Sequence, residues 1–332
     1  LVQQDEQGRF PMAQQLVNIA KYYGFDGWLI NPETDLTRVK DKSGNLLNDR
    51  FQTYRAAKVA KKVQDFMIYL TEIAPQGMEI HWYDAMLIDG TVKWQNELNA
   101  NNADFLQLHG EKSERVSDAM FLNYWWNSDM VHDTHAFAKK IGRSPYELYF
   151  GADLSPARNA QRIFERRQWL DALFTEEGTT ALSSIALFAN DVNFTFSGND
   201  KREAISQFKT NSQDVQRFYR SELRLFAGDD LNLAIDDLTT RWPGIGRYVP
   251  AKSTVLSLPF RTNFNAGHGL VKANQGKVEQ REWHDVSQQD VLPTWQFAVF
   301  GDQSTSVFYD FDNVFHGGSS LAIRTVENSE GS

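Results

Sequence analysis

The chain has 332 residues, enough for about two domains at roughly 100–200 residues each. Its 34 basic and 43 acidic residues give a net charge of −9, which disfavours nucleic acid as a partner. Cysteine is absent, so disulfides, thiolate nucleophiles and Cys-ligated metal sites are excluded. No apolar run approaches the ~18 residues of a membrane span, so we expect no membrane insertion.

Residues 1 to about 250 alternate helix-period segments with short apolar runs, the pattern of repeated βα units. We expect helices over 11–23, 49–74 and 134–142, and strands over 25–30, 79–86, 119–126, 147–154 and 183–190. After a boundary rich in Pro and Gly at 241–252 the pattern changes. Antiparallel strands are expected within 253–265, 294–300 and 304–314, where apolar and polar residues alternate.

These patterns predict an α/β fold in which a (β/α)8 TIM barrel is followed by a β-sandwich segment. We assign 1–245 to the barrel, as its C-terminal five βα units, and 251–332 to the start of a β-sandwich that could bind carbohydrate. Five units are three short of a closed barrel, and an open one would leave strand edges exposed. We therefore expect an internal piece of a longer polypeptide whose other barrel strands precede Leu1.

Each predicted strand of the first part ends in polar or acidic residues, and active sites of parallel barrels lie at these carboxyl ends. The clearest case is Asn31-Pro32-Glu33 after the first strand. Asn31 and Glu33 are two residues apart, so an extended backbone projects both side chains to the same side. Pro32 favours that extended backbone.

One carboxyl beside an amide differs from the carboxylate pair of ordinary glycosidases. It suits substrate-assisted cleavage of an N-acetylhexosamine, in which the sugar's own acetamido oxygen attacks the anomeric carbon. Glu33 would then be the general acid, and Asn31 would orient the acetamide. An aromatic, poorly solvated pocket would favour such an acid, and the aromatic content of 13% with nine tryptophans fits a sugar cleft. From this segment alone, a strand-terminating turn with Glu33 on the surface is an equal alternative.

The spacing D-G-x-x-x-N-x-E at 26–33 resembles the chitinase-type signature D-x-x-D-x-D-x-E, with Leu29 and Asn31 in place of two of its acids. This variant resembles glycoside hydrolase family 85, the endo-β-N-acetylglucosaminidases, and more closely its bacterial secreted members. Further runs resemble the same family along nearly the whole chain: 81–86, 94–102, 121–127, 144–154, 264–269, 292–295 and 315–321.

The resemblance implies that Asn31 promotes an oxazolinium intermediate and that Glu33 acts as general acid and then general base. Tyr83, at the end of the next strand, matches a family tyrosine that contacts the acetamido group. The reaction would cut the β-1,4 bond between the two core GlcNAc residues of N-glycans on glycoproteins with retention, and transglycosylation is a possible outcome. The resemblance implies no cofactor and no metal, and we expect a monomer.

Other residues at the strand ends are candidates for substrate binding. Strand alternation makes Trp82 a core residue, and for Asp84 we favour holding Tyr83 in place over binding a sugar hydroxyl. Trp94, in a loop of polar residues, is expected to stack on a sugar. We assign Trp126 to the cleft and leave the role of Trp125 open, and Asn123 is expected to point inward near the acetamide.

At the later strand ends, Asp153, Asn190 and Asp191 could contact mannose hydroxyls. We favour hydrogen bonding to neighbouring loops for these three residues. His132 and His135 flank Asp133, but no further metal ligand is close in sequence. Helix capping by Asp133 or Thr134 is the better explanation of that segment. In the second part, the run 264–269 contains His268, which is expected to be structural.

Two other functions stay open. A non-catalytic glycan-binding adhesin or lectin would fit the aromatic content and the β segment, but it has no need for Glu33. A chitinase-like hydrolase is disfavoured because Leu29 and Asn31 replace two of its carboxylates. For localisation we expect a secreted or cell-surface bacterial protein, or a cytosolic one if the chain is a eukaryotic member.

Overall fold

The computed structural model describes residues 2–46, 50–110, 113–154, 169–175, 177–178, 180–189, 191, 193, 212–231, 242–250, 255–291 and 305–325. The chain divides into two compact units. The first comprises Leu1–Asp153 and Gln168–Phe188, and the second Leu154–Arg167 and Ala189–Ser332. No helix among the described residues is long and apolar enough to cross a membrane.

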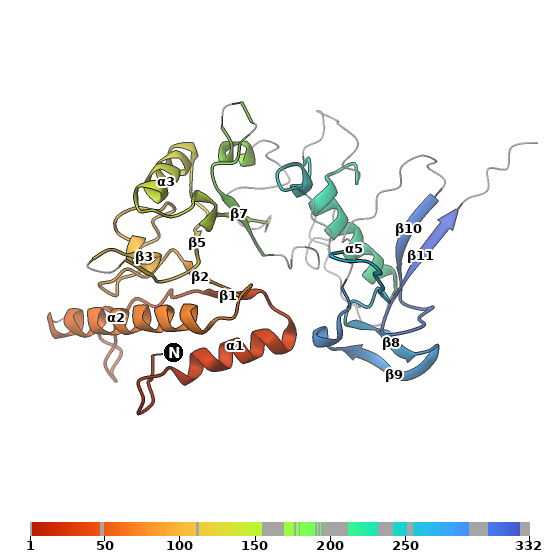
Figure 1. Cartoon of the computed structure of the whole chain (residues 1–332), viewed down its shortest axis with the longest axis horizontal. Coiled ribbons are helices and arrows are strands. Elements are labelled where there is room, and N and C mark those ends of the chain that lie inside the picture. Colours follow the sequence, from red (N-terminus) through yellow and green to blue (C-terminus); the bar gives the residue numbers. More distant parts are fainter. Residues whose placement is uncertain are drawn as a thin grey trace, which may run out of the picture. The chain divides into compact units, whose positions relative to one another are not determined.

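The first unit is built on a five-stranded parallel sheet in the order β1-β2-β5-β6-β7 (Figure 1). Its strands are β1 (Gly27–Ile30), β2 (Glu79–Tyr83), β5 (Ala119–Leu122), β6 (Leu148–Asp153) and β7 (Ser184–Phe188). The helices are α1 (Pro11–Tyr23), α2 (Arg50–Ile73) and α3 (Ser128–Lys140). The five predicted strands and their parallel arrangement are therefore confirmed, with shorter ends than expected.

Short elements complete the first unit. A two-stranded antiparallel ladder joins β3 (Gln107–Leu108) to β4 (Glu114–Arg115). Three 3-10 turns, η1 (Ala103–Phe105), η2 (Pro145–Glu147) and η3 (Trp169–Leu173), lie in the connections between the larger elements.

Helix α1 leads the chain into β1 through a sharp turn. Pro11 opens the helix, and Gly24 closes it in the left-handed conformation with φ 73°. Gly27 then begins β1 with φ 153°, and a Cβ on this residue would collide with the carbonyl oxygen of Glu79 on β2. The glycine of the D-G-x-x-x-N-x-E spacing is thus required by the close approach of two strands.

The two faces of the sheet carry different residues. On one face Trp82 is fully buried and stacks on Phe105 of η1, with ring centroids 4.0 Å apart, which confirms it as a core residue. The opposite face carries a cluster around Tyr83 and Phe121, and the partly buried residues packed against it include Tyr124, Tyr149 and Phe188. Alternation along the strands produces this separation.

Helix α3 begins six residues earlier than predicted. Its N-cap is Asn127, whose side-chain oxygen accepts a hydrogen bond from the backbone N–H of Met130. The proposed capping by Asp133 or Thr134 is wrong, because both lie inside the helix. The hydroxyl of Thr134 instead accepts a hydrogen bond from the backbone N–H of Leu98 at 3.0 Å.

The second unit contains α5 (Ser212–Ala227) and two antiparallel strand pairs. β8 (His268–Asn274) pairs with β9 (Lys277–His284), and β10 (Thr305–Asp310) pairs with β11 (Ser320–Thr325). Two 3-10 turns, η4 (Ile245–Arg247) and η5 (Val286–Gln288), also belong to this unit. A sandwich built from these pairs stays a prediction.

Only part of the predicted β pattern of this unit is correct. The alternation at 304–314 contains β10, which confirms that strand. Residues 255–265 form no strand, although a strand was expected there, and 294–300 lie outside the described residues. The hairpin of β8 and β9 was not predicted, because β9 is almost wholly exposed and lacks alternation of apolar and polar residues.

His268 is partly buried and packs against the core cluster of Tyr309 and Phe311 in the second unit. Its Nε2 is 2.9 Å from the hydroxyl of Tyr219, and its ring stacks on Phe311 at 5.6 Å between centroids. Burial lowers the pKa of His268 to about 4, with a smaller contribution from His284. These contacts fit the structural role expected for His268.

We predict that His268 makes the protein sensitive to acid. Because the folded pKa of about 4 lies below the ordinary value of 6.5, the unfolded chain binds more protons between these pH values. The stabilising contribution is present above about pH 6.5 and is lost as the pH falls through about 4. Melting curves from pH 7 to 4 should show a smaller loss of stability for His268→Gln than for the wild type. The same substitution at the exposed His132, on helix α3, is the control for the change of residue type.

Candidate active site

The segment Asn31-Pro32-Glu33 follows β1 directly, as the sequence predicts. Ile30 pairs with Trp82 across β1 and β2, so continuing this register by one residue brings Asn31 level with Tyr83. The side chains of Asn31 and Glu33 are both exposed. The poorly solvated surroundings expected for Glu33 are therefore not provided by the part of the chain that the structure describes.

Trp94 reaches the proposed acid from a loop 61 residues further along the chain. Its indole N–H donates a hydrogen bond to Oε1 of Glu33 at 3.2 Å. Trp94 is 47% exposed, which leaves it accessible to a ligand. The loop after β2 thus provides both a hydrogen-bond donor for Glu33 and an exposed aromatic surface beside it.

Tyr83 and Asn123 form a buried pair at the ends of β2 and β5. The hydroxyl of Tyr83 donates to the side-chain oxygen of Asn123 at 2.8 Å. Burial raises the pKa of the Tyr83 hydroxyl; the neighbouring Tyr124 and the Glu33 carboxylate add to this rise, and a hydrogen bond with Trp94 opposes it. Tyr83 therefore stays a neutral hydroxyl close to Glu33. Asn123 is buried beside it, and its expected place near the acetamide stays a prediction.

Asp84 has a different role from the predicted one. Its side chain is fully buried, and its Oδ2 accepts hydrogen bonds from the backbone N–H groups of Gln95 at 2.9 Å and Asn96 at 2.6 Å. Its Oδ1 accepts from Nδ2 of Asn102 at 2.9 Å. Burial raises the pKa of Asp84 to about 7, and the three donors oppose that rise. Asp84 thus holds the loop that carries Trp94, a role that the sequence analysis did not predict.

The same loop is linked to the next one through Asn96. This residue adopts a positive φ of 60°, and its Oδ1 accepts a hydrogen bond from the backbone N–H of Trp125 at 3.1 Å. Within the loop, Oε1 of Gln95 accepts from the amides of Asn99 and Asn101. The high density of amide side chains at 94–102 was the available signal for such a network, since they readily bond to nearby backbone.

The structure distinguishes the neighbouring rings of Trp125 and Trp126. Trp126 is half-buried, donates its indole N–H to the carbonyl oxygen of Gly151 at 2.9 Å, and packs edge-on against Phe150. These contacts do not support the assignment of Trp126 to the cleft. Trp125, whose role was left open, is 63% exposed. The ring of this pair that is free to stack on a ligand is therefore Trp125.

Three predicted sugar-contacting residues belong to the later strand ends, Asp153, Asn190 and Asp191. Asp153 is buried at the end of β6, in register with Phe188 of β7. Asp191 is exposed, and Asn190 lies outside the described residues. Their proposed contacts with mannose hydroxyls or neighbouring loops stay predictions.

The described residues contain no group of three or more His, Asp or Glu side chains that could hold a metal ion. His135, which had suggested such a site, places its Nδ1 2.8 Å from the carbonyl oxygen of Leu182. That contact ties helix α3 to the segment before β7 and explains the histidine without a metal.

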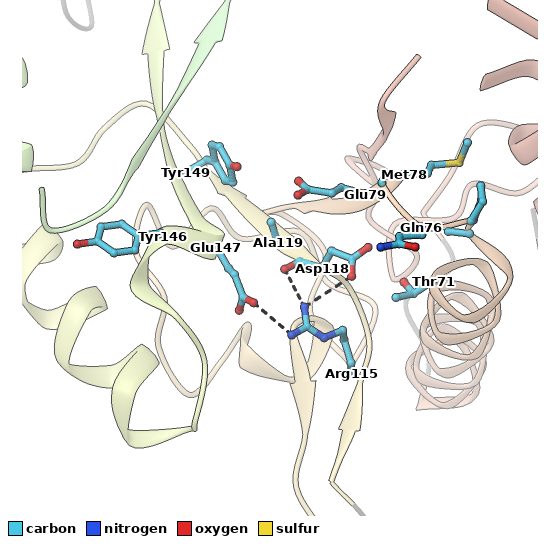
Figure 2. Close-up of a pocket in the computed structure, with 13 residues that line it drawn as sticks. Thr71, Gln76, Met78, Glu79, Arg115, Asp118, Ala119, Tyr146, Glu147 and Tyr149 are labelled. Atoms are coloured by element: carbon cyan, nitrogen blue, oxygen red, sulfur yellow. Dashed lines mark hydrogen bonds and ion pairs between the residues drawn. The ribbon is translucent and has the colours of Figure 1, made fainter. Parts of the chain in front are cut away.

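A cavity of about 400 Å³ lies at the other end of the same strands (Figure 2). Its lining includes Glu79 at the start of β2, Asp118 just before β5, and Glu147 just before β6. Arg115 contacts Glu147 at 3.2 Å and Asp118 at 3.6 Å. The ion pairs brace the amino ends of the strands, whereas catalysis in parallel barrels takes place at the carboxyl ends.

The amide, the carboxyl and the tyrosine lie at neighbouring carboxyl ends of a parallel α/β sheet, which is where barrel enzymes carry their active sites. The profile of glycosyl hydrolase family 85 matches residues 1–271 of the chain. The chain belongs to this family, as its motifs had indicated.

Individual relatives agree with the family assignment. The chain is 27% identical over 314 residues to the cytosolic endo-β-N-acetylglucosaminidase of Gallus gallus, covering 94% of this chain and 34% of that protein. The human protein of the same name is 25% identical over 331 residues, covering 97% of this chain and 35% of its own length. The chain thus spans about a third of these curated relatives.

A solved structure resembles the fold. The glycoside hydrolase domain of Endo-D from Streptococcus pneumoniae R6 matches with a TM-score of 0.66 and 27% identity, covering 96% of this chain and 45% of that one. The parallel sheet of the first unit is accordingly a half-barrel of the kind found in that domain. The closed eight-stranded barrel stays a prediction.

Proposed function

We propose that this chain carries the catalytic centre of an endo-β-N-acetylglucosaminidase that cuts the β-1,4 bond between the two core GlcNAc residues of N-glycans. One observation carries the proposal: Asn31 and Glu33 follow β1, level with the buried Tyr83–Asn123 pair, and Trp94 donates to Glu33. Membership of family 85 and the names of the relatives support the same activity.

In the proposed mechanism the substrate supplies its own nucleophile. The carbonyl oxygen of the 2-acetamido group attacks the anomeric carbon while Glu33 protonates the departing glycosidic oxygen. Asn31 accepts a hydrogen bond from the acetamide N–H and so orients the acetamide oxygen for attack. The product of this step is an oxazolinium ring, and the reducing-end GlcNAc leaves on its asparagine.

In the second step Glu33, now a carboxylate, removes a proton from water as the water attacks the anomeric carbon. Two inversions at that carbon give overall retention. A sugar hydroxyl in place of water would give transglycosylation. The Tyr83 hydroxyl is suited to hydrogen-bond the acetamido group or the oxazoline, because it stays neutral and can donate or accept.

The sugar contacts in this proposal come from Trp94, Asn123, Asp153 and Asn190, as predicted. Trp125, which is 63% exposed, takes the place predicted for Trp126, because the indole N–H of Trp126 is bonded to Gly151. The exposed faces of Trp94 and Trp125 suit stacking on sugar rings. For localisation, the relatives named as cytosolic are animal and plant proteins, whereas the structural neighbour is bacterial. We keep secretion as a prediction for a bacterial source, tested by locating the native protein in medium or lysate.

The decisive experiment is digestion of an N-glycosylated peptide with the full natural polypeptide that contains these residues. We expect release of a free glycan and a peptide that gains the mass of one retained GlcNAc, detected by mass spectrometry. Binding without cleavage would support the lectin, and cleavage of chitin oligomers in preference to the glycopeptide would support the chitinase-like enzyme.

Tyr83→Phe should weaken this activity without abolishing it. The change removes one hydroxyl and leaves the acceptor oxygen of Asn123 buried, so the expected loss is about 1–3 kcal/mol of transition-state stabilisation at most. Steady-state kinetics on a glycopeptide would measure it. Tyr149→Phe, on the same face of the sheet in β6, is the control and should lose less. Complete inactivation by Tyr83→Phe would mean that the hydroxyl takes part in a proton transfer.

A further inference from the structure

Three hydrogen bonds join the loop at 94–102, which we call the Trp94 loop, to a single side chain. Three of its hydrogen-bond donors, the backbone N–H groups of Gln95 and Asn96 and the amide of Asn102, converge on the two oxygens of Asp84. The Asp84 side chain is fully buried and immediately follows Tyr83 at the end of β2. The strand and the loop are thus joined at the residue next to the active-site tyrosine.

The loop residues that Asp84 holds are next to Trp94, which contacts the proposed acid Glu33. Gln95 and Asn96 are the next residues after Trp94, whose indole N–H donates to Glu33 at 3.2 Å. Asn96 also accepts a hydrogen bond from the backbone N–H of Trp125. The position of the indole relative to Glu33 therefore depends on how the two following backbone amides are held.

We infer that Asp84 is a positioning residue of the active site, which aims the indole N–H of Trp94 at Glu33 by anchoring the backbone of Gln95 and Asn96. This inference rests on the proposed function of Glu33 as general acid. Above its raised pKa of about 7, the Asp84 carboxylate can accept all three hydrogen bonds at once, whereas an amide has only one oxygen and presents two N–H donors. Asp84→Asn would set an amide N–H against one of these three donors and release part of the loop.

The test is a double-mutant cycle of Asp84→Asn and Trp94→Phe on glycopeptide hydrolysis. Misplacing a catalytic group by about 1 Å can cost ~10²-fold in rate, so we expect Asp84→Asn to lower kcat by about 10–100-fold. Trp94→Phe keeps an aromatic ring but removes the N–H. In the Trp94→Phe protein, Asp84→Asn should lower kcat by a clearly smaller factor, because the N–H donor that Asp84 positions is already absent.

Asp118→Asn is the matched control. Asp118 is also a carboxylate of the same sheet, accepts the backbone N–H of Ile80 at 2.8 Å, and lies at the opposite, amino end of the strands. It should lower the melting temperature and leave kcat of the folded protein nearly unchanged in both backgrounds. If the losses from Asp84→Asn and Trp94→Phe multiply fully, or if Asp84→Asn lowers only the melting temperature, Asp84 does not act through Trp94.

A spectroscopic readout separates this inference from the proposed function. In protein labelled with 5-fluorotryptophan, the fluorine resonance of Trp94 is the line missing from Trp94→Phe. Asp84→Asn should shift or broaden this line, and Asp118→Asn should not. An unchanged line would overturn the positioning role even in an active enzyme. A shifted line in a protein that cleaves no glycan would contradict the proposed function and leave the anchoring by Asp84 intact.

Discussion

Glu33→Gln should lower the rate of N-glycan hydrolysis by roughly 10²–10⁴-fold, the usual contribution of a general acid–base group. The glutamine has nearly the same size and still offers an oxygen to the indole N–H of Trp94, so the change removes the transferable proton and little else. Release of free glycan from a glycopeptide, followed over time, measures the effect.

The control for Glu33 lies two residues further along the same segment. The Asp35 carboxylate accepts a hydrogen bond from the backbone N–H of Thr37 at 2.9 Å, and Asp35→Asn should affect activity far less. If Glu33→Gln retains more than about a tenth of the wild-type rate, Glu33 is not the acid, because losing a general acid should leave a much lower rate.

Asn31→Ala should block hydrolysis of intact glycan but still transfer a pre-formed sugar oxazoline to a GlcNAc acceptor. The proposed task of Asn31 ends once the oxazoline exists, because only the first step requires the acetamide to be oriented. Glu33 remains available to deprotonate the incoming hydroxyl. The product should accumulate, since the variant cannot readily form oxazoline from it again.

Mass spectrometry of one acceptor with the oxazoline donor, run with Asn31→Ala, Glu33→Gln and the double variant, tests this separation of roles. If Asn31→Ala fails with the oxazoline as completely as Glu33→Gln does, Asn31 acts in both steps. Normal hydrolysis of intact glycan by Asn31→Ala would rule out assistance through this residue. The assay requires the full natural polypeptide.

The structure differs from the sequence-based interpretation at the start of α3, and it bears on the direction of Trp126. The start of α3 was missed because two tryptophans precede its N-cap, Asn127, and resemble a continuing strand. Trp126 was assigned to the cleft from strand alternation alone, but β5 ends at Leu122, so alternation no longer fixes its direction. Its direction is fixed by the carbonyl oxygen of Gly151, on the neighbouring strand.

The sequence by itself determined the order and approximate limits of the parallel strands and of α1 and α2, because helical and strand periodicity are properties of nearest neighbours. It also determined that Asn31 and Glu33 stand together after β1, since two residues of extended chain suffice for that. Only the tertiary structure decided that Trp94 donates to Glu33 across 61 residues and that Tyr83 pairs with Asn123 across 40. The role of Asp84 follows from the same cause. Its partners lie 11 to 18 residues away in an irregular loop, where no periodicity relates one residue to another and only the folded backbone brings donor to acceptor.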